Sequence, residues 1–359
     1  MKQYNVAIIG QGRSGRDIHG AFLRSDLNGG RFKVAAVAER IPERAERAKA
    51  EYGADCAVYD DYTKLFERGD IDFVVNSTTS EQHYAVSMAL MAHGLSVISE
   101  KPCARTAAEV DSLIDASKNV KLFNIFQQSR FTPYFRKIKE IIASGVLGRL
   151  VEIDIAFSGY ARRWDWQTLQ SFSGGNLYNT GPHPLDQALN LLDMYDGMPQ
   201  VFCRMDRANT FGDAEDYVKL ILTAPEKPLI DLAISSCDAY PSFTYKLHGT
   251  RGGLRGTMTD IDWKWYIPEE APAQKLISEP LAKADGTPSY CVEALPWHTD
   301  KWSAKDSGAF DSAVNCYYTM IYDYLTEGKE MPINPKQVRQ QIAVIEEAHR
   351  QNPLSRICG

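Results

Sequence analysis

The stretch GQGRSG, residues 10–15, constrains the fold of this chain more than any other segment. It directly follows the strand-like run YNVAIIG and opens the helical pattern SGRDIHGAFLRS. In a GxGxxG spacing, one glycine permits a tight turn, the next lets the backbone approach a pyrophosphate, and the third lets helix and strand pack closely. The helix N-terminus directs free N–H groups toward the phosphates. We therefore expect a dinucleotide site, rather than a purely structural turn, at Gly10, Gly12, Arg13, Ser14 and Gly15.

The segment around this loop, residues 1–123, alternates short apolar runs with helical patterns. Residues 33–40, 72–78 and 95–102 are near-continuous apolar runs, which is typical of strands buried on both faces of a parallel sheet. Helix-like segments separate these runs. The alternation predicts an N-terminal α/β domain with a doubly wound, Rossmann-type parallel sheet.

The rhythm changes in residues 124–359. Strand-like runs such as LVEIDIAFSG, YVKLILTA and PLIDLAISSC follow one another without long helices between them, which favours a mostly antiparallel sheet. Residues 267–305 are rich in proline and charge and are interpreted as a long surface loop, with covering a site or reaching a neighbouring subunit as the alternatives. We expect a second, C-terminal domain.

Composition excludes several other kinds of protein. A net charge of −6 argues against nucleic acid or an anionic membrane as a partner. No apolar stretch approaches the roughly 18 residues of a membrane span. The N-terminus enters a strand-like run at once, so we expect no signal peptide and a cytoplasmic protein. The seven cysteines are scattered without a CxxC pair, so neither a disulfide framework nor a metal site is expected.

The acidic residue expected about 20 residues after the glycine loop is Glu39. A carboxylate there accepts hydrogen bonds from ribose hydroxyls and repels a 2′-phosphate, which favours NAD over NADP. Arg40 follows directly and Arg13 lies inside the loop, and either guanidinium is able to meet a 2′-phosphate. NAD is therefore the expected cofactor, and NADP stays open.

The run 95–102 ends in Glu-Lys-Pro, which places Lys101 where strand ends face the cofactor crevice. Proline at 102 moves Lys101 out of the helical region and permits a cis bond. A lysine that is partly desolvated beside a nicotinamide ring and near a positive charge has a lowered pKa. It is then able to take a proton from an alcohol while hydride leaves for the ring. A solvated surface lysine is the alternative.

The GxGxxG loop, STTSEQH at 77–83, EKP at 100–102 and GGNLYNTGPHPLD at 174–186 together resemble the glucose–fructose oxidoreductase and inositol dehydrogenase family, Gfo/Idh/MocA. The resemblance covers essentially the whole chain. It implies a Rossmann domain followed by an α/β domain with a large open sheet. It also implies NAD(P)-dependent oxidation or reduction of sugars, cyclitols or related polyols by homodimers or homotetramers.

The resemblance also implies roles for residues around the nicotinamide. Lys101 matches the family's catalytic lysine, and Glu100 matches a residue near the nicotinamide ribose. Thr78 and His83 match positions that line the cofactor. Arg130 matches a recurrent arginine near the nicotinamide or the substrate.

By the same resemblance, His183 matches the catalytic histidine that bonds to or exchanges a proton with the reacting hydroxyl. Asn179, one helical turn earlier, stands where the family often has aspartate. An asparagine orients a hydroxyl but does not ionise, so proton transfer falls more heavily on Lys101. Asp186 is expected to be structural.

Two tryptophans, Trp164 and Trp166, precede the glycine-rich stretch and are candidates for stacking on a sugar ring. Plugging the domain junction is their alternative role. The expected substrate-binding set is completed by Lys101, Asn179 and His183.

These observations predict an NAD(P)-dependent dehydrogenase that acts on a sugar, glycoside or cyclitol. A glycoside-cleaving enzyme that oxidises a ring carbon transiently is the second hypothesis. A non-enzymatic, nucleotide-binding regulator on the same fold is the third.

Overall fold

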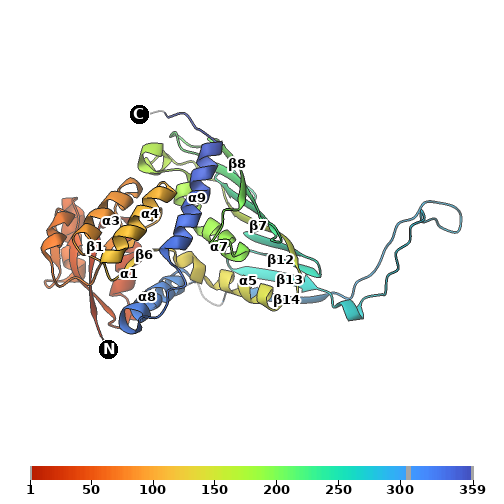
Figure 1. The fold of residues 1–359 in the computed structure, drawn as a ribbon, viewed down its shortest axis with the longest axis horizontal. Helices are drawn as coiled ribbons and strands as arrows, with labels where there is room; N and C mark the ends of the chain where they lie inside the picture. Colours follow the sequence, from red (N-terminus) through yellow and green to blue (C-terminus); the bar gives the residue numbers. More distant parts are fainter. Residues whose placement is uncertain (1, 305–308, 357–359) are drawn as a thin grey trace.

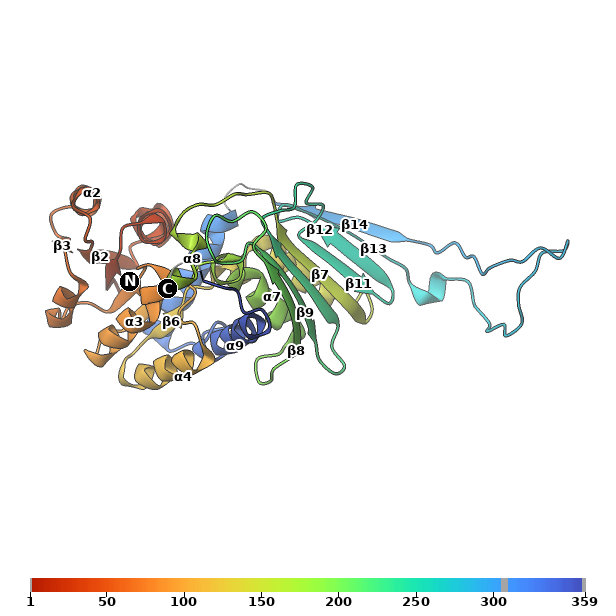
Figure 2. The same ribbon diagram turned by 90° about the horizontal axis from the view of Figure 1, so that it is seen from above.

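A computed structural model describes residues 2–304 and 309–356 of the chain. These residues form two sheets with helices packed beside and between them (Figures 1 and 2). The predicted parallel sheet and the predicted, mostly antiparallel second sheet are both confirmed. Within the described residues, none of the helices combines the length and the apolar character needed to span a bilayer.

The first sheet has six parallel strands in the order β3-β2-β1-β4-β5-β6. The strand order reverses between β1 and β4, and ligands of such sheets bind outside the carboxyl ends of the strands at that point. The strands are β1 (Tyr4–Ile9), β2 (Phe32–Ala38), β3 (Ala57–Tyr59), β4 (Phe73–Asn76), β5 (Val97–Ser99) and β6 (Phe123–Ile125).

Helices on both faces bury these strands, which is why their sequences are continuously apolar. Every residue of β4 and β5 is buried. The covering helices are α2 (Pro42–Tyr52), α3 (His83–Ala92) and α4 (Ala107–Ala116). α4 begins in a capping box, in which Thr106 and Glu109 satisfy each other's backbone N–H groups.

The helix predicted after the glycine loop is present, but most of it is a π-helix rather than an α-helix. It is a π-helix, η1 (Arg13–Gly20), followed by a single α-helical turn, α1 (Ala21–Arg24). Gly20 is the last residue of η1 and packs closely against Tyr52. A Cβ at this position would lie 2.2 Å from the Tyr52 hydroxyl oxygen, so a larger residue would force the Tyr52 side chain to move. π-Helical turns are rare and concentrate at functional sites.

The second sheet has eight strands in the order β14-β13-β12-β11-β7-β10-β9-β8. β7 and β10 pair in parallel, and all other neighbours pair antiparallel. The strands are β7 (Leu150–Ser158), β8 (Gln200–Asp206), β9 (Tyr217–Thr223), β10 (Leu229–Ser235), β11 (Tyr245–Gly249), β12 (Gly252–Gly256), β13 (Asp260–Trp265) and β14 (His298–Ser303).

One face of this sheet is covered and the other is open, as the alternation along β10 shows. Ile230, Leu232 and Ile234 are fully buried, whereas Asp231 between them is only partly buried. Three helices lie on the covered face: α5 (Pro133–Ala143), α7 (Pro182–Leu192) and α9 (Pro335–Gln351) (Figures 1 and 2). A short helix, α6 (Asn176–Asn179), precedes α7. Among the described residues, no helix lies on the open face.

The last helices tie the two sheets together. α8 (Ala309–Glu327) packs on the first sheet, where Tyr317 and Tyr318 share a core cluster with Val6 and Ile8 of β1. α9 packs against α4 and β8. The domain boundary at residue 123 stays a prediction. Residues of α8, from the last part of the chain, complete the hydrophobic core around the first sheet.

The predicted excursion at 267–305 is shorter than expected, because residues 298–303 form β14. His298 pairs with Trp265 and Trp302 with Ile261 in the β13–β14 ladder. The remaining segment, residues 267–297, extends far from the body in both views (Figures 1 and 2).

Candidate active site

The glycine loop follows β1 and packs against Ser77, the residue that follows β4. Gly10 has a φ of +86°, and a Cβ there would lie 2.6 Å from the Ser77 carbonyl oxygen. A Cβ at Gly15 would lie 1.9 Å from the Gly10 carbonyl oxygen. These two glycines are therefore required by the chain itself. Gly12 differs, because a Cβ there would meet only Arg44 at 3.7 Å. The described chain therefore does not itself require a glycine at this position, and its predicted contact with a pyrophosphate stays a prediction.

Glu39 lies at the end of β2, where the ribose-binding carboxylate was expected. It is 7 % exposed and accepts hydrogen bonds from the N–H groups of Gln11 (2.6 Å) and Ile41 (2.9 Å). The carboxylate thereby holds the glycine loop against the start of α2. Arg13 and Arg40 are exposed beside it, and Ser14 is half-buried at the start of η1.

Two prolines interrupt the helical segment that carries Asn179 and His183. Pro182 and Pro184 lack N–H groups, so they cannot continue the hydrogen-bond ladder from the preceding turn. α7 begins at Pro182, in the first turn of a helix, where a proline is tolerated. The His183 N–H donates to the Thr180 carbonyl (3.2 Å) and leaves the Asn179 carbonyl to another donor.

That donor is the Lys101 side chain. The Lys101 Nζ donates to the Asn179 carbonyl oxygen at 2.7 Å. The Lys101–Pro102 peptide is cis, which the proline permits. Lys101 and the segment that leads into α7, far apart in the sequence, are therefore joined directly.

Charges around Lys101 adjust its basicity. Burial lowers the pKa of Lys101, and the positive charges of Arg13 and Arg163 lower it further, whereas the carboxylate of Glu100 raises it. The net effect is a lowered pKa, so a larger fraction of Lys101 is in the neutral amine form near physiological pH.

A buried network that the sequence analysis missed holds Glu100 in place. The ring nitrogens of His19, in η1, contact the Tyr318 hydroxyl (2.7 Å, Nδ1) and the Glu100 carboxylate (3.1 Å, Nε2). A carboxylate only accepts, so Nε2 carries the proton and the Tyr318 hydroxyl donates to Nδ1. Burial raises the pKa of Glu100, but the hydrogen bond from His19 and the nearby positive charges outweigh burial and lower the pKa to about 2. The only sequence signal was a histidine one helical turn after Gly15.

His183 lies in the first turn of α7, close enough to Lys101 for their charges to interact. Burial and the positive charge of Lys101 lower the pKa of His183 to about 3, so the imidazole is neutral at working pH. Its Nδ1 is buried and has no hydrogen-bond partner among the described residues. Buried polar atoms are normally paired. This nitrogen therefore has a hydrogen-bonding capacity that the described residues do not use.

His83 ties together the two loops that follow β4 and β5. Its ring nitrogens contact the carbonyl oxygens of Pro102 (2.8 Å) and Thr78 (3.0 Å). Burial lowers the pKa of His83, so the neutral ring donates to one carbonyl at a time. The Thr78 hydroxyl donates to Asn76 (2.8 Å). A cofactor-lining role for Thr78 and His83 stays a prediction.

Arg130 forms a buried ion pair with Asp186 in α7. Its Nε donates to Asp186 Oδ2 at 2.9 Å, its Nη2 donates to Oδ1, and its Nη1 donates to the Pro332 carbonyl at 2.7 Å. Asp186 has the structural role expected of it. That Arg130 also lines the cofactor site stays a prediction.

The two tryptophans predicted to bind substrate lie in the loop between β7 and α6. Trp164 is 79 % exposed, which is incompatible with plugging a domain junction, and Trp166 is 36 % exposed. Within this loop, Arg163 pairs with Asp165 at 2.5 Å. Arg163 and Asn179 line the same small cavity. The loop therefore runs beside the residues that contact Lys101.

Two family models match successive parts of the chain. Residues 4–125 match a family model described as an oxidoreductase family with an NAD-binding Rossmann fold. Residues 135–255 match the model of the Gfo/Idh/MocA C-terminal domain.

Curated relatives are similar at low identity. The chain is 24 % identical over 354 residues to a scyllo-inositol 2-dehydrogenase (NADP⁺) of Bacillus subtilis, covering 96 % of this chain and 92 % of that protein. It is 26 % identical over 271 residues to a 2,7-anhydro-N-acetylneuraminate hydratase of Mediterraneibacter gnavus, covering 72 % and 69 %.

Solved structures share the fold. An NAD-binding protein from Listeria innocua superposes with a TM-score of 0.78 at 20 % identity over 98 % of this chain and 97 % of that one. An oxidoreductase from Agrobacterium radiobacter in complex with NAD⁺, L-tartaric acid and magnesium gives a TM-score of 0.72 at 20 % identity, covering 98 % and 97 %.

Proposed function

The chain belongs to the Gfo/Idh/MocA family of NAD-binding oxidoreductases, and from this premise we propose that it transfers a hydride between NAD(P) and a hydroxyl-bearing carbon of a sugar, glycoside or cyclitol. The observation that carries the proposal is the contact between Lys101 and the segment leading into α7, because it brings an amine of lowered pKa beside a neutral imidazole. We also propose that the protein works as a homodimer or homotetramer, as the family resemblance implies.

Each residue has a separate task in this reaction. When bound, the nicotinamide supplies the hydride acceptor or donor. The neutral amine of Lys101 takes the proton of the reacting hydroxyl during oxidation and returns it during reduction. The unpaired Nδ1 of His183 and the amide of Asn179 orient that hydroxyl, and Glu39 and the glycine loop hold the dinucleotide.

The loop between β7 and α6 supports a ring-shaped, hydroxyl-bearing substrate. Exposed aromatic faces such as that of Trp164 pack against the C–H faces of a sugar ring. A curated relative that matches nearly the whole chain is named as a dehydrogenase of an inositol, which, like a cyclic sugar, carries hydroxyl groups on ring carbons.

The test is the reduction of NAD⁺ and NADP⁺ on a panel of sugars, glycosides and inositols. Lys101→Met is expected to lower turnover by about 10²–10⁴-fold, the usual contribution of a general base, with cofactor affinity retained. Lys118→Met, at an exposed lysine of which 72 % of the side chain is accessible, is the matched control. Turnover by Lys101→Met equal to that of the control would remove Lys101 from the mechanism.

A second candidate is an elimination or hydration reaction without net redox change. The relative from Mediterraneibacter gnavus is named a hydratase, and its match covers 72 % of this chain. Here the substrate would be oxidised transiently, altered, and reduced again. Release of product from a glycoside or anhydrosugar without accumulation of NADH favours this reaction, and cofactor binding without turnover on any compound of the panel favours the nucleotide-binding regulator.

A further inference from the structure

The short helix α6 presents the backbone carbonyl that Lys101 contacts, so its position matters to the proposed proton transfer. Asn179 is the last residue of α6, and its carbonyl oxygen lies 2.7 Å from the Lys101 Nζ. A helix this short is not stable through its own hydrogen bonds, because isolated helices of fewer than about 12–15 residues are marginal in water. Contacts from the rest of the chain must therefore hold α6 in place.

Glu215, which precedes β9, holds the first turn of α6 through both its backbone and its side chain. Its backbone carbonyl accepts a hydrogen bond from the Asn176 N–H at 2.9 Å, and its Oε1 accepts one from the Leu177 N–H at 3.0 Å. Glu215 is only 2 % exposed, so water does not compete for these bonds. The start of α6 is thus fixed from one residue outside it.

The Glu215 carboxylate also lies directly against Gly175, the residue before α6. A Cβ at Gly175 would lie 2.4 Å from Glu215 Oε1 and 2.5 Å from Oε2. Gly175 has a φ of +101°, which glycine adopts with little strain. The glycine therefore allows the carboxylate to approach the backbone of the segment that leads to Asn179.

His349 of α9 supplies the opposite charge. Its Nδ1 lies 2.9 Å from the Ile345 carbonyl oxygen, and its Nε2 lies 3.7 Å from Glu215 Oε2. Both neighbours only accept hydrogen bonds, so both ring nitrogens are expected to carry protons and the imidazole to be positively charged. Burial and the charge of Arg105 lower the pKa of His349, but Glu215 and the Ile345 carbonyl outweigh them and the pKa is raised.

The same imidazole packs on α6. It stacks on the Tyr178 ring, with 4.8 Å between the ring centroids and 18° between the ring planes. The Tyr178 hydroxyl in turn donates to the Arg105 carbonyl at 3.1 Å. Tyr178 directly precedes Asn179, so His349 and Glu215 together hold both ends of α6.

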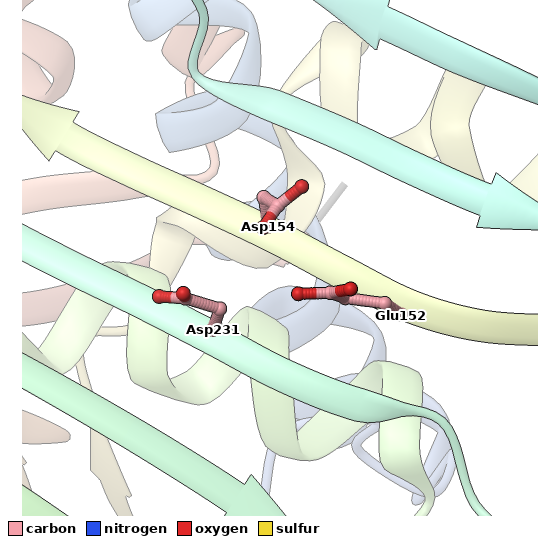
Figure 3. Close-up of side chains that lie close together, drawn as sticks. All are labelled: Glu152, Asp154 and Asp231. Carbon is pink, nitrogen blue, oxygen red and sulfur yellow. The ribbon is translucent and has the colours of Figure 1, made fainter.

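Another histidine–carboxylate pair in this chain lies on the open face of the second sheet. Asp154 of β7, beside Glu152 and Asp231 (Figure 3), pairs with His248 at 2.9 Å. The Asp154 side chain is 20 % accessible, against 1 % for that of Glu215. Among the described residues, no hydrogen bond joins the Asp154 side chain to α6. This second pair is therefore an internal reference for the first.

We propose that Glu215, paired with His349, is a positioning residue that fixes α6 so that the Asn179 carbonyl stays within hydrogen-bond distance of Lys101. Glu215 acts through the helix, because its carboxylate contacts the first turn of α6 and Lys101 contacts the last residue. This inference rests on the proposed function, since it gives Glu215 a task in the same proton transfer.

The turnover of Glu215 variants tests the role on a compound that the wild-type protein oxidises. Glu215→Ala leaves the Leu177 N–H without its acceptor and is expected to lower kcat by about 10²-fold, the cost of a displacement of about 1 Å at a reacting centre, with KM for NAD⁺ unchanged. Glu215→Gln keeps an oxygen for that N–H and is expected to restore most of the rate. In a Lys101→Met background, Glu215→Ala is expected to cost no further activity.

The neighbouring carboxylate of Asp216 provides the matched control. Asp216 is 7 % exposed and accepts hydrogen bonds from the N–H groups of Ala208 and Asn209 at 2.7 Å each, so its side chain holds a different loop. Asp216→Ala is expected to lower stability and keep kcat per folded molecule. An equal fall in kcat per folded molecule in Glu215→Ala and Asp216→Ala would overturn the proposal.

Two measurements on the full chain do not depend on activity. By NMR, the His349 imidazole is expected to titrate above the usual value of about 6.5, and Glu215→Gln is expected to lower that midpoint because it removes the negative charge. The His248 signal is expected to stay unchanged, because Asp154 is untouched. In Glu215→Ala, amide hydrogen exchange in residues 176–181 is expected to be about tenfold faster, with β4 and β5 unaffected.

These outcomes separate the positioning role from the proposed function. An unchanged His349 titration in Glu215→Gln, or unchanged exchange at 176–181 in Glu215→Ala, would refute the hold on α6. Faster exchange with an unchanged kcat would refute the positioning role and leave the dehydrogenase standing. Faster exchange in a protein that turns over no compound of the panel would count against the proposed function instead.

Discussion

Replacing Asp186 by asparagine is expected to lower the free energy of unfolding by about 3 kcal/mol, near the lower end of the cost of breaking a buried ion pair. Asp186 is fully buried and Arg130 is 6 % exposed, so the guanidinium loses its counter-charge without gaining water. The asparagine oxygen still accepts one of the two hydrogen bonds, which keeps the loss near that end of the range. The bond from Arg130 to the Pro332 carbonyl holds the charge in place.

Urea unfolding followed by tryptophan fluorescence measures this loss, and an exposed pair provides the control. Arg339 and Asp111 also form two hydrogen bonds, of 3.0 and 3.1 Å, but 39 % and 53 % of their side chains are accessible. Asp111→Asn is therefore expected to cost no more than about 1 kcal/mol. The double change Arg130→Met with Asp186→Leu is expected to recover most of the loss, because it removes both buried charges.

The reasoning fails if Asp186→Asn costs no more than Asp111→Asn. Arg130 would then be free to serve elsewhere. Loss of NAD⁺ affinity without loss of stability in Arg130→Met would favour the place beside the nicotinamide that the family resemblance implies.

Three further predictions concern the active site. Gly12→Ala is expected to weaken cofactor binding and leave the fold intact, whereas Gly15→Ala is expected to destabilise the protein, because only a Cβ at Gly15 collides with backbone atoms. Titration with NAD⁺ measures the first effect, and thermal unfolding measures the second. The oxidation rate is expected to rise with pH as Lys101 loses its proton, at a pH below the value of about 10.4 for a free lysine, and the profile in Lys101→Met should be flat over that limb. Asn179→Asp is expected to raise the pKa of His183 above its value of about 3, because it adds a negative charge nearby; an unchanged imidazole titration by NMR would contradict this.

The sequence by itself determined the local architecture. Strands buried on both faces require continuous apolar runs, and the GxGxxG loop needs glycines at Gly10 and Gly15 for reasons of backbone contact, so both were visible in the order of residues. The two prolines in the first turn of α7 act just as locally, since a proline ring constrains only its own neighbours. Such features depend on sterics and burial periodicity over a few residues.

Only the tertiary structure decided which distant groups meet. His19 and Tyr318 are 299 positions apart and bond because α8 returns to the first sheet. The partner of Arg130 was likewise set by which faces pack together. A periodic pattern shows that a face is buried but not which face covers it, because many apolar surfaces would satisfy the same burial. The polar contacts that position Lys101 and Glu100 therefore followed from packing.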